Sequence, residues 1–285
     1  MEVFQKMIDA RGLTNKNTII TYKNQFKKLI DLMDDDKFYE ASEKKLKEAF
    51  EKSDLSARAK YNLINLVIMI KKQLDYKTDD LDAFRKSLQK QISEDTTDKL
   101  KTLDLPDYDD YFSKFDKSFA ESKPQKYIVN KLIQMFGFRN LDLLLTIIKL
   151  NGRKKLPNDN INYMVVRKDR IELVISNYKT SKTHGVKYLT FTKKENPILF
   201  KTINKYYNDG NRFLLQKRNG EQIAIKSLSK TVDALTYALG TGKLFKMIVK
   251  NLREEGKLNE LKSMGESRGT NINTIISNYN MNDDS

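Results

Sequence analysis

The chain has 285 residues, of which 53 are Lys or Arg and 38 are Asp or Glu, so its formal net charge is +15. A balance this positive favours a polyanionic partner, and nucleic acid is the first expectation. The chain has no cysteine and one histidine, His184, which excludes disulfides, thiol catalysis, cysteine zinc sites, histidine metal clusters and the usual His-dependent triad.

The first third of the chain is predicted to be helical. Between residues 19 and 33, apolar residues recur at 3.6-residue spacing and form one face of a helix. Further helices are predicted over residues 42–52 and after Ser56, whose residue type predicts an N-cap. Residues 1–95 therefore form a helical bundle with lysines facing outward. The lysines off the first apolar face, as typical of a solvated surface as of DNA contacts, are Lys23, Lys27 and Lys28.

Residues 96–115 are predicted to link two domains. The composition from Tyr76 to about Ser118 is polar and acidic, and Pro106 interrupts it after a helix predicted near residues 81–92. Such a segment is typical of a domain boundary. The second domain is then expected over residues 116–285.

The second domain is predicted to open with a helix over residues 131–150. Arg139 begins an otherwise apolar run, and Asp142 follows it three positions later on the same helical face. A buried arginine is costly unless it is paired or binds an anion. The pattern therefore has two interpretations: an Arg139–Asp142 pair that closes a helix end, or a guanidinium that Asp142 orients towards a phosphate.

A small antiparallel sheet is predicted next, with strands at residues 160–166, 170–175 and 186–191. The loop before the last strand carries Lys179 and Lys182. The fold class is therefore mainly α with a small antiparallel β-sheet. The remaining segments are helices predicted over 197–207, 227–239, 243–253, 258–264 and 272–279, with a loop at 265–270.

The order of these segments resembles the tyrosine recombinase (phage integrase) family over most of the chain. Residues 137–144 are similar to the family's Gly-Leu-Arg-x-x-Glu-Leu-Leu box, with Arg139 at the first catalytic arginine. Lys179, and Lys182 as second match, look like the hairpin lysine, and Tyr279 looks like the terminal nucleophile. The resemblance implies a helical core-binding domain, an α+β catalytic domain, and strand exchange through a 3′-phosphotyrosyl link. It implies no cofactor and no metal ion.

The chain departs from the family at two boxes. The His-x-x-Arg box falls on Lys243 and Lys246, and the His or Trp of the later box falls on Glu266 or, in a shifted register, on Arg268. The resemblance implies that these cations, with Arg139, hold charge at the phosphate while Lys179 protonates the leaving 5′-oxygen, with Asp142 and Lys182 in support. Lysine lacks the planar fork of arginine, so weaker stabilisation is expected. The other interpretation of Lys243 and Lys246 is a solvated helix start.

Double-stranded DNA is the partner that the resemblance implies, with a homo-oligomer on DNA and a viral or mobile-element source. The six residues after Tyr279 are too few for the helix that many members exchange between protomers. No apolar run has the length of a membrane span and the first residues lack a signal-peptide layout, so we expect an intracellular protein, in host cytoplasm, nucleus or virion.

Three other functions fit the sequence. The first is a catalytically inactive recombinase-fold protein that binds DNA as an accessory, which the missing His-x-x-Arg arginine supports. The second is a type IB topoisomerase, whose chemistry is the same. The third is a helical protein–protein scaffold with a basic surface, which would leave the order of the motifs unexplained.

Overall fold

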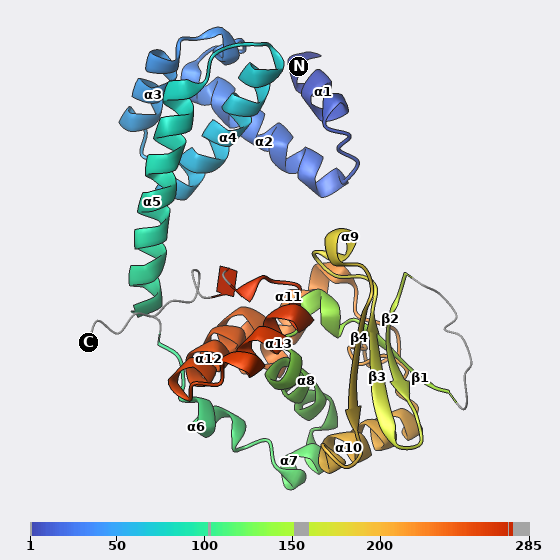
Figure 1. The fold of residues 1–285 in the computed structure, drawn as a ribbon. Helices are drawn as coiled ribbons and strands as arrows, with labels where there is room; N and C mark the ends of the chain where they lie inside the picture. The colour runs from blue at the N-terminus through green and yellow to red at the C-terminus, as the bar shows by residue number, and fades with distance from the viewer. Residues whose placement is uncertain (1, 102–103, 151–159, 273, 276–285) are drawn as a thin grey trace. The chain divides into compact units, whose positions relative to one another are not determined.

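The computed structural model describes residues 2–101, 104–150, 160–272 and 274–275. The chain divides after residue 102 into two compact units, which we call unit 1 (residues 1–102) and unit 2 (residues 103–285). Both are drawn in Figure 1, and each is described separately. Among the described residues, no helix combines the length and the apolar character needed to cross a membrane.

Unit 1 is a bundle of helices, as the sequence predicts. Its helices start where polar side chains cap them: Asn15, Ser42 and Ser56 each accept a backbone N–H of the following turn. The core is made of side chains such as Phe26 and Leu46, which are fully or almost fully buried. The elements are α1 (Glu2–Ala10), α2 (Lys16–Met33), η1 (Phe38–Glu40), α3 (Glu43–Lys52), α4 (Ala57–Gln73) and α5 (Asp79–Lys101).

The segment expected to be a linker contains regular structure. Helix α5 continues to Lys101, and α6 (Tyr108–Phe112) and α7 (Lys117–Ser122) follow after the division between the units. Tyr111 and Phe115 are buried in the core of unit 2. Residues 108–115 therefore belong to the packed part of unit 2, because their aromatic side chains bury apolar area there.

The long helix predicted over residues 131–150 is wrong beyond Phe136. Helix α8 (Pro124–Phe136) ends at Gly137, whose φ of 62° lies in the left-handed region and whose N–H donates to the carbonyl of Ile133. The apolar run after it forms the 3₁₀ turn η2 (Asn140–Leu143) and the strand β1 (Leu145–Lys149). A short buried strand and a buried helix have the same apolar composition, so periodicity did not separate them.

Unit 2 has a four-stranded sheet in the order β1-β2-β3-β4. The three predicted strands are confirmed and pair antiparallel, whereas β1 pairs parallel to β2, so the sheet is mixed. Figure 1 shows α8 between this sheet and the pair α12 and α13. The remaining elements are β2 (Asn162–Val166), β3 (Arg170–Ile175), α9 (Ser181–His184), β4 (Lys187–Thr192), α10 (Pro197–Asn208), α11 (Ile225–Leu235), α12 (Gly240–Glu254) and α13 (Leu258–Arg268).

Candidate active site

Arg139 lies between the end of α8 and the start of η2. Its Nη1 donates to the backbone carbonyl of Arg268, and its Nη2 donates to Oγ1 of Thr270 at 2.7 Å. The guanidinium therefore joins two segments that are about 130 positions apart in the sequence. Both acceptors are uncharged, so these hydrogen bonds orient the positive charge without neutralising it.

Asp142 holds the backbone at Arg139. Its Oδ2 accepts the backbone N–H of Arg139 at 2.8 Å, and the residue is only 3% exposed. Oδ1 is buried and has no hydrogen-bond partner among the described residues. Burial raises the pKa of Asp142, against the opposing effects of that N–H and of the nearby cations. The carboxylate thus fixes the main chain, and the Arg139 guanidinium makes its hydrogen bonds elsewhere.

Lys187 is the cation that the sequence analysis missed. It begins β4, and its Nζ donates to the carbonyl of Ser267 at 2.8 Å and lies 4.0 Å from the centroid of the Tyr178 ring. Burial lowers its pKa to about 8; the charge of Asp142 opposes this shift, and those of Arg139 and Arg268 add to it. An ammonium with this pKa donates a proton near neutral pH more readily than an ordinary lysine.

The strand alternation contained a signal for Lys187. Along β4, Lys187, Leu189 and Phe191 are the less exposed residues, and Tyr188 and Thr190 alternate with them as exposed ones. A lysine at a position that shares a face with core residues needs a partner or a function. The prediction of a strand over residues 186–191 did not single out Lys187, although the alternation places it on the face of the core residues.

The two lysines predicted from the hairpin motif lie elsewhere. Lys179 is exposed after Tyr178, and Lys182 is exposed within α9. Within the described residues, no hydrogen bond or ion pair that the structure shows joins either of them to Arg139 or Lys187. The assignment of Lys179 as the proton donor, with Lys182 as the second match, stays a prediction.

Arg268 ends α13 and points into the core. It is 7% exposed, its guanidinium carbon lies 3.8 Å from the centroid of the Phe245 ring, and its Nη1 donates to the carbonyl of Gly137. A Cβ at Gly137 would lie 2.8 Å from the Phe245 ring, so this junction needs glycine. Arg268 therefore fastens the turn that leads into Arg139, while Glu266, the other residue predicted for this box, is exposed.

Helix α12 begins beside Arg139. Oγ1 of Thr241 donates to Oδ1 of Asn140 at 2.8 Å, which places the first turn of α12 against the residue after Arg139. Lys243 is exposed in that turn, and Lys246 is half-buried one turn later. Burial lowers the pKa of Lys246, and the charge of Lys243 lowers it further. Both lysines thus come from the helix start that borders the candidate site.

The predicted loop at residues 265–270 starts later than expected. Helix α13 continues through Gly265 to Arg268, and Gly269, with φ of 66°, ends it. A Cβ at Gly269 would lie 2.6 Å from Oγ1 of Thr180 and 2.8 Å from Nζ of Lys187. The close approach of this backbone to Lys187 therefore depends on glycine.

Tyr279 lies outside the described residues. Ile275 itself is held in place, because it is fully buried and its Cδ1 would lie 2.7 Å from a Cβ placed on Gly265. The role of Tyr279 as nucleophile stays a prediction.

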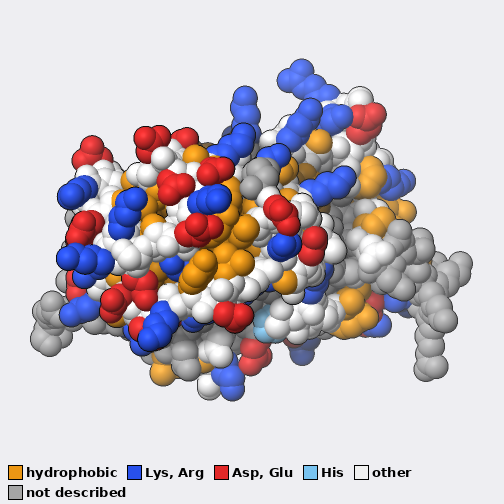
Figure 2. Space-filling view, turned by 90° about the horizontal axis from the view of Figure 1, so that it is seen from above, with side chains coloured by type: hydrophobic (Ala, Val, Ile, Leu, Met, Phe, Trp, Pro, Cys, Tyr) orange, Lys and Arg blue, Asp and Glu red, His pale blue; other side chains and the backbone are white. Residues whose placement is uncertain are grey.

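In unit 1, three lysines are predicted to contact DNA: Lys23, Lys27 and Lys28. All three are exposed on α2, whose Phe26 and Leu29 face the core. On the face drawn in Figure 2, Lys and Arg side chains are mixed with Asp and Glu side chains, so positive charge does not form one continuous patch there.

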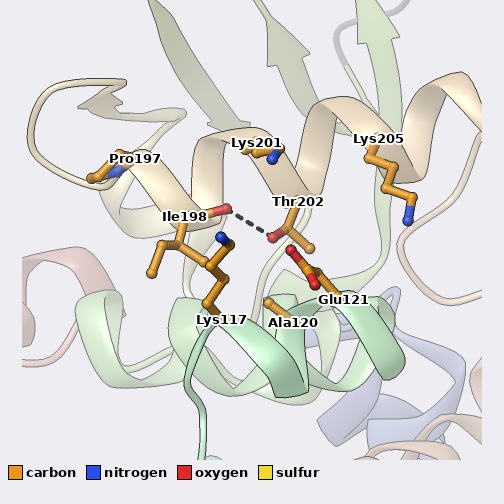
Figure 3. Close-up of a pocket in the computed structure, with 8 residues that line it drawn as sticks. All are labelled: Lys117, Ala120, Glu121, Pro197, Ile198, Lys201, Thr202 and Lys205. Atoms are coloured by element: carbon orange, nitrogen blue, oxygen red, sulfur yellow. Dashed lines mark hydrogen bonds between the residues drawn. The ribbon is translucent and has the colours of Figure 1, made fainter.

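A groove of about 300 Å³ opens between α7 and α10 (Figure 3). Lys117, Lys201 and Lys205 line it together with Glu121, and none of the candidate catalytic residues does. No group of three or more His, Cys, Asp or Glu side chains in the described part of the chain could hold a metal ion.

Comparison with known proteins gives a structural likeness. No family model and no curated protein matches the chain. The chain is similar to the crystal structure of XerA recombinase, with a TM-score of 0.39 and 12% sequence identity. That similarity covers 99% of this chain and 94% of the XerA chain.

Proposed function

We propose that this chain cleaves and rejoins double-stranded DNA through a 3′-phosphotyrosyl intermediate, as a site-specific recombinase or integrase. The observation that carries the proposal is the convergence of Arg139, Lys187 and Arg268, from three separate segments, around the buried carboxyl group of Asp142. Three cations face one carboxyl group whose pKa is raised, so the site is positive overall and suits a phosphate.

In the proposed mechanism the hydroxyl oxygen of Tyr279 attacks the scissile phosphorus and loses its proton to solvent. The bond from phosphorus to the 5′-oxygen breaks, and the Lys187 ammonium protonates that leaving oxygen. Arg139 offsets the negative charge that grows on the non-bridging oxygens. Reversal of the same steps with a partner 5′-hydroxyl rejoins the strand.

The remaining candidates have supporting roles in this proposal. Lys243 and Lys246 keep positive charge near the phosphate from the start of α12, and Arg268 positions Arg139 by holding the carbonyl of Gly137. Unit 1 contributes phosphate contacts through the exposed lysines of α2. Assembly as a homo-oligomer on DNA belongs to the same proposal.

A second candidate function is DNA binding without cleavage. The hydrogen bonds of Arg139 favour it, because Nη1 and Nη2 already donate to Arg268 and Thr270. The lysines at the start of α12 favour it as well, since lysine cannot clamp a phosphate through two parallel hydrogen bonds. This protein would bind duplex DNA through the same positive site and leave the strands intact.

A covalent capture experiment separates the two functions. The full chain is incubated in EDTA with a random-sequence library of nicked suicide duplexes, and adducts that survive denaturation in SDS are collected and sequenced. We expect an adduct with the wild type and none with Tyr279→Phe, which should bind duplex DNA as tightly, because it loses only the attacking oxygen. Tyr188→Phe, which changes a tyrosine that is 74% exposed on β4, is the matched control and should form the adduct normally.

Two results would contradict the proposal, the first by excluding cleavage and the second by excluding Tyr279 as the nucleophile. One is the absence of any wild-type adduct while duplex binding is retained, which supports the binding protein. The other is an adduct that persists in Tyr279→Phe, which moves the nucleophile to another residue.

A further inference from the structure

The turn between α11 and α12 has an unusual backbone. Tyr237 and Ala238 have φ of 53° and 64°, so two consecutive residues other than glycine lie in the left-handed region. This conformation is unfavourable for residues with a Cβ, and it persists only where the surroundings enforce it.

Buried hydrogen bonds enforce this turn. Thr236 is fully buried, and its Oγ1 accepts the N–H of Gly240 at 2.9 Å and donates to the carbonyl of Val232 at 2.8 Å. The backbone N–H of Ala238 donates to the carbonyl of Asp233 at 2.8 Å. The strained turn is therefore held from several sides, and it fixes the position of the Tyr237 side chain.

The ring of Tyr237 is 43% exposed and attracts two ammonium groups. Nζ of Lys126 lies 3.5 Å from its centroid, and Nζ of Lys114 lies 4.8 Å from it. Tyr111 and Phe115 pack edge-on against the same ring, with centroid distances of 6.3 and 6.4 Å. The ring is thus fixed by its aromatic neighbours and holds both lysines in place through cation–π attraction.

These lysines repel one another. Burial lowers the pKa of Lys126, and the charges of Lys123 and Lys114 lower it further. Within the described residues, none of the three forms a salt bridge of the kind that pairs other lysines of this chain. The nearby Asp116 uses its Oδ1 to accept the N–H of Phe119. An anion with several oxygens would offset the repulsion among the three ammonium groups.

This cluster is separate from the candidate active site. Lys126 lies in the first turn of α8, whereas Arg139 follows the last turn. From Lys126 to Phe136 the helix rises about 15 Å, at about 1.5 Å per residue. A phosphate held at Arg139 is therefore a different one from a phosphate held at Lys126.

We propose that Lys114, Lys123, Lys126 and Tyr237 form a second phosphate site, which holds the backbone of a DNA segment away from the cleaved bond. The inference rests on the proposed function in taking DNA as the partner. Ammonium groups contact phosphates without reading base edges, so this site adds affinity and orientation but no sequence preference.

The salt dependence of duplex binding tests the site. In the full chain, Lys114, Lys123 and Lys126 are changed together to Gln, and the affinity for a 30-base-pair duplex is measured from low to high salt by fluorescence anisotropy. The slope of log affinity against log salt should become shallower by up to about 3, since each lost phosphate contact removes about 0.9. The matched control is Lys117→Gln with Lys201→Gln and Lys205→Gln, the lysines of the groove in Figure 3, which should change the slope by less than about 1.

Three outcomes would overturn the site. Equal changes of slope in both triple variants would show a general charge effect, and an unchanged slope in the cluster variant would show that the lysines do not bind phosphate. Polyglutamate that competes with the duplex at equal affinity would show that the cluster binds carboxylates of an acidic protein instead.

The ring is tested by Tyr237→Gly, which removes the aromatic side chain and suits the left-handed backbone. We expect duplex affinity about threefold lower, because the ammonium groups lose their support. The unfolding temperature should change little, because relief of the strained backbone opposes the loss of ring packing against Tyr111 and Phe115. Unchanged affinity would show that the ring has no part in the site.

Different measurements would refute the second phosphate site and the proposed DNA cleavage. Adduct formation by the wild type tests the proposed function, whereas the salt dependence of duplex binding by the cluster variant tests the second site. A wild type without adduct, whose duplex binding still depends on the cluster, would refute catalysis and support the second site.

Discussion

The two units place their cations differently. In unit 1, Lys23, Lys27 and Lys28 are exposed on α2. In unit 2, Arg268 and Lys187 are withdrawn from solvent, and both donate hydrogen bonds to other segments. An exposed lysine needs only a position off the apolar face of a helix, whereas a buried cation needs acceptors that folding brings to it.

The acceptors in unit 2 show how positive charge is kept. Arg139, Lys187 and Arg268 each donate to a backbone carbonyl, and those carbonyls belong to Arg268, Ser267 and Gly137. A carbonyl satisfies an N–H donor but does not cancel its charge. Since these three cations face the single carboxyl group of Asp142, the site stays positive, which suits a phosphate. The lysines of unit 1 suit the binding of phosphates in general.

The sharpest test of this difference is Arg139→Ala. The rate of adduct formation should fall by about 10² to 10³, because the charge on the phosphorane loses a fixed donor, while duplex affinity changes by only a few-fold. Single-turnover kinetics on a captured suicide duplex measure the rate. Arg139→Lys keeps the charge and loses the planar fork, so it should recover part of the loss. A fall of less than about fivefold for Arg139→Ala would place the phosphate elsewhere.

Lys187→Ala should reduce the rate by about 10², the usual size of a general-acid contribution. A duplex whose 5′-bridging oxygen is replaced by sulfur should restore the rate, since that leaving group needs no proton. Lys179→Ala is the matched control from the same hairpin and should behave like the wild type. Sulfur rescue of Lys179→Ala instead of Lys187→Ala would return the proton donor to the loop that the motif predicted.

The pH dependence of the rate of adduct formation and of the free energy of unfolding tests the role of Lys187. Burial lowers its pKa in the folded chain from the ordinary 10.5 to about 8, so the rate should fall as pH rises through about 8 and the ammonium is lost. Between pH 8 and 10.5 the unfolded chain binds more protons at this residue than the folded chain does. As pH rises through this range, Lys187 therefore increases the free energy of unfolding, which stabilises the folded chain. Chemical denaturation at pH 8 and pH 10 should show that the free energy of unfolding of the wild type, measured relative to that of Lys187→Met, is higher at pH 10; the comparison removes the opposing effect of the buried tyrosines, which both proteins share.

The smallest effect is expected in unit 1. Changing Lys23, Lys27 and Lys28 together to Gln should weaken duplex binding several-fold at low salt and very little at high salt, because exposed charges are screened. The rate of adduct formation at saturating DNA should not change. A fall of that rate comparable to the loss in Arg139→Ala would mean that the α2 lysines do more than bind.

Much of the fold could be predicted from local patterns. The helices of unit 1 follow from apolar spacing and from capping residues such as Ser42 and Ser56, and three strands of unit 2 follow from short apolar runs separated by turn residues. Helix α8 was extended too far because the apolar run after Gly137 suits a buried strand as well as a helix. That run forms β1, and its pairing with β2 satisfies its backbone groups.

Local sequence patterns likewise predicted only part of the candidate site. Arg139 stands out in the sequence because a charged residue in an apolar run needs an explanation, and that inference requires only its neighbours. Lys187 becomes a candidate when Ser267, 80 positions away, supplies a carbonyl and the surrounding segments bury its ammonium group. Arg268 likewise meets Gly137 across 131 positions. Spacing along the chain records which residues share a helix or strand face, whereas the pKa and partners of a side chain depend on segments that meet after folding.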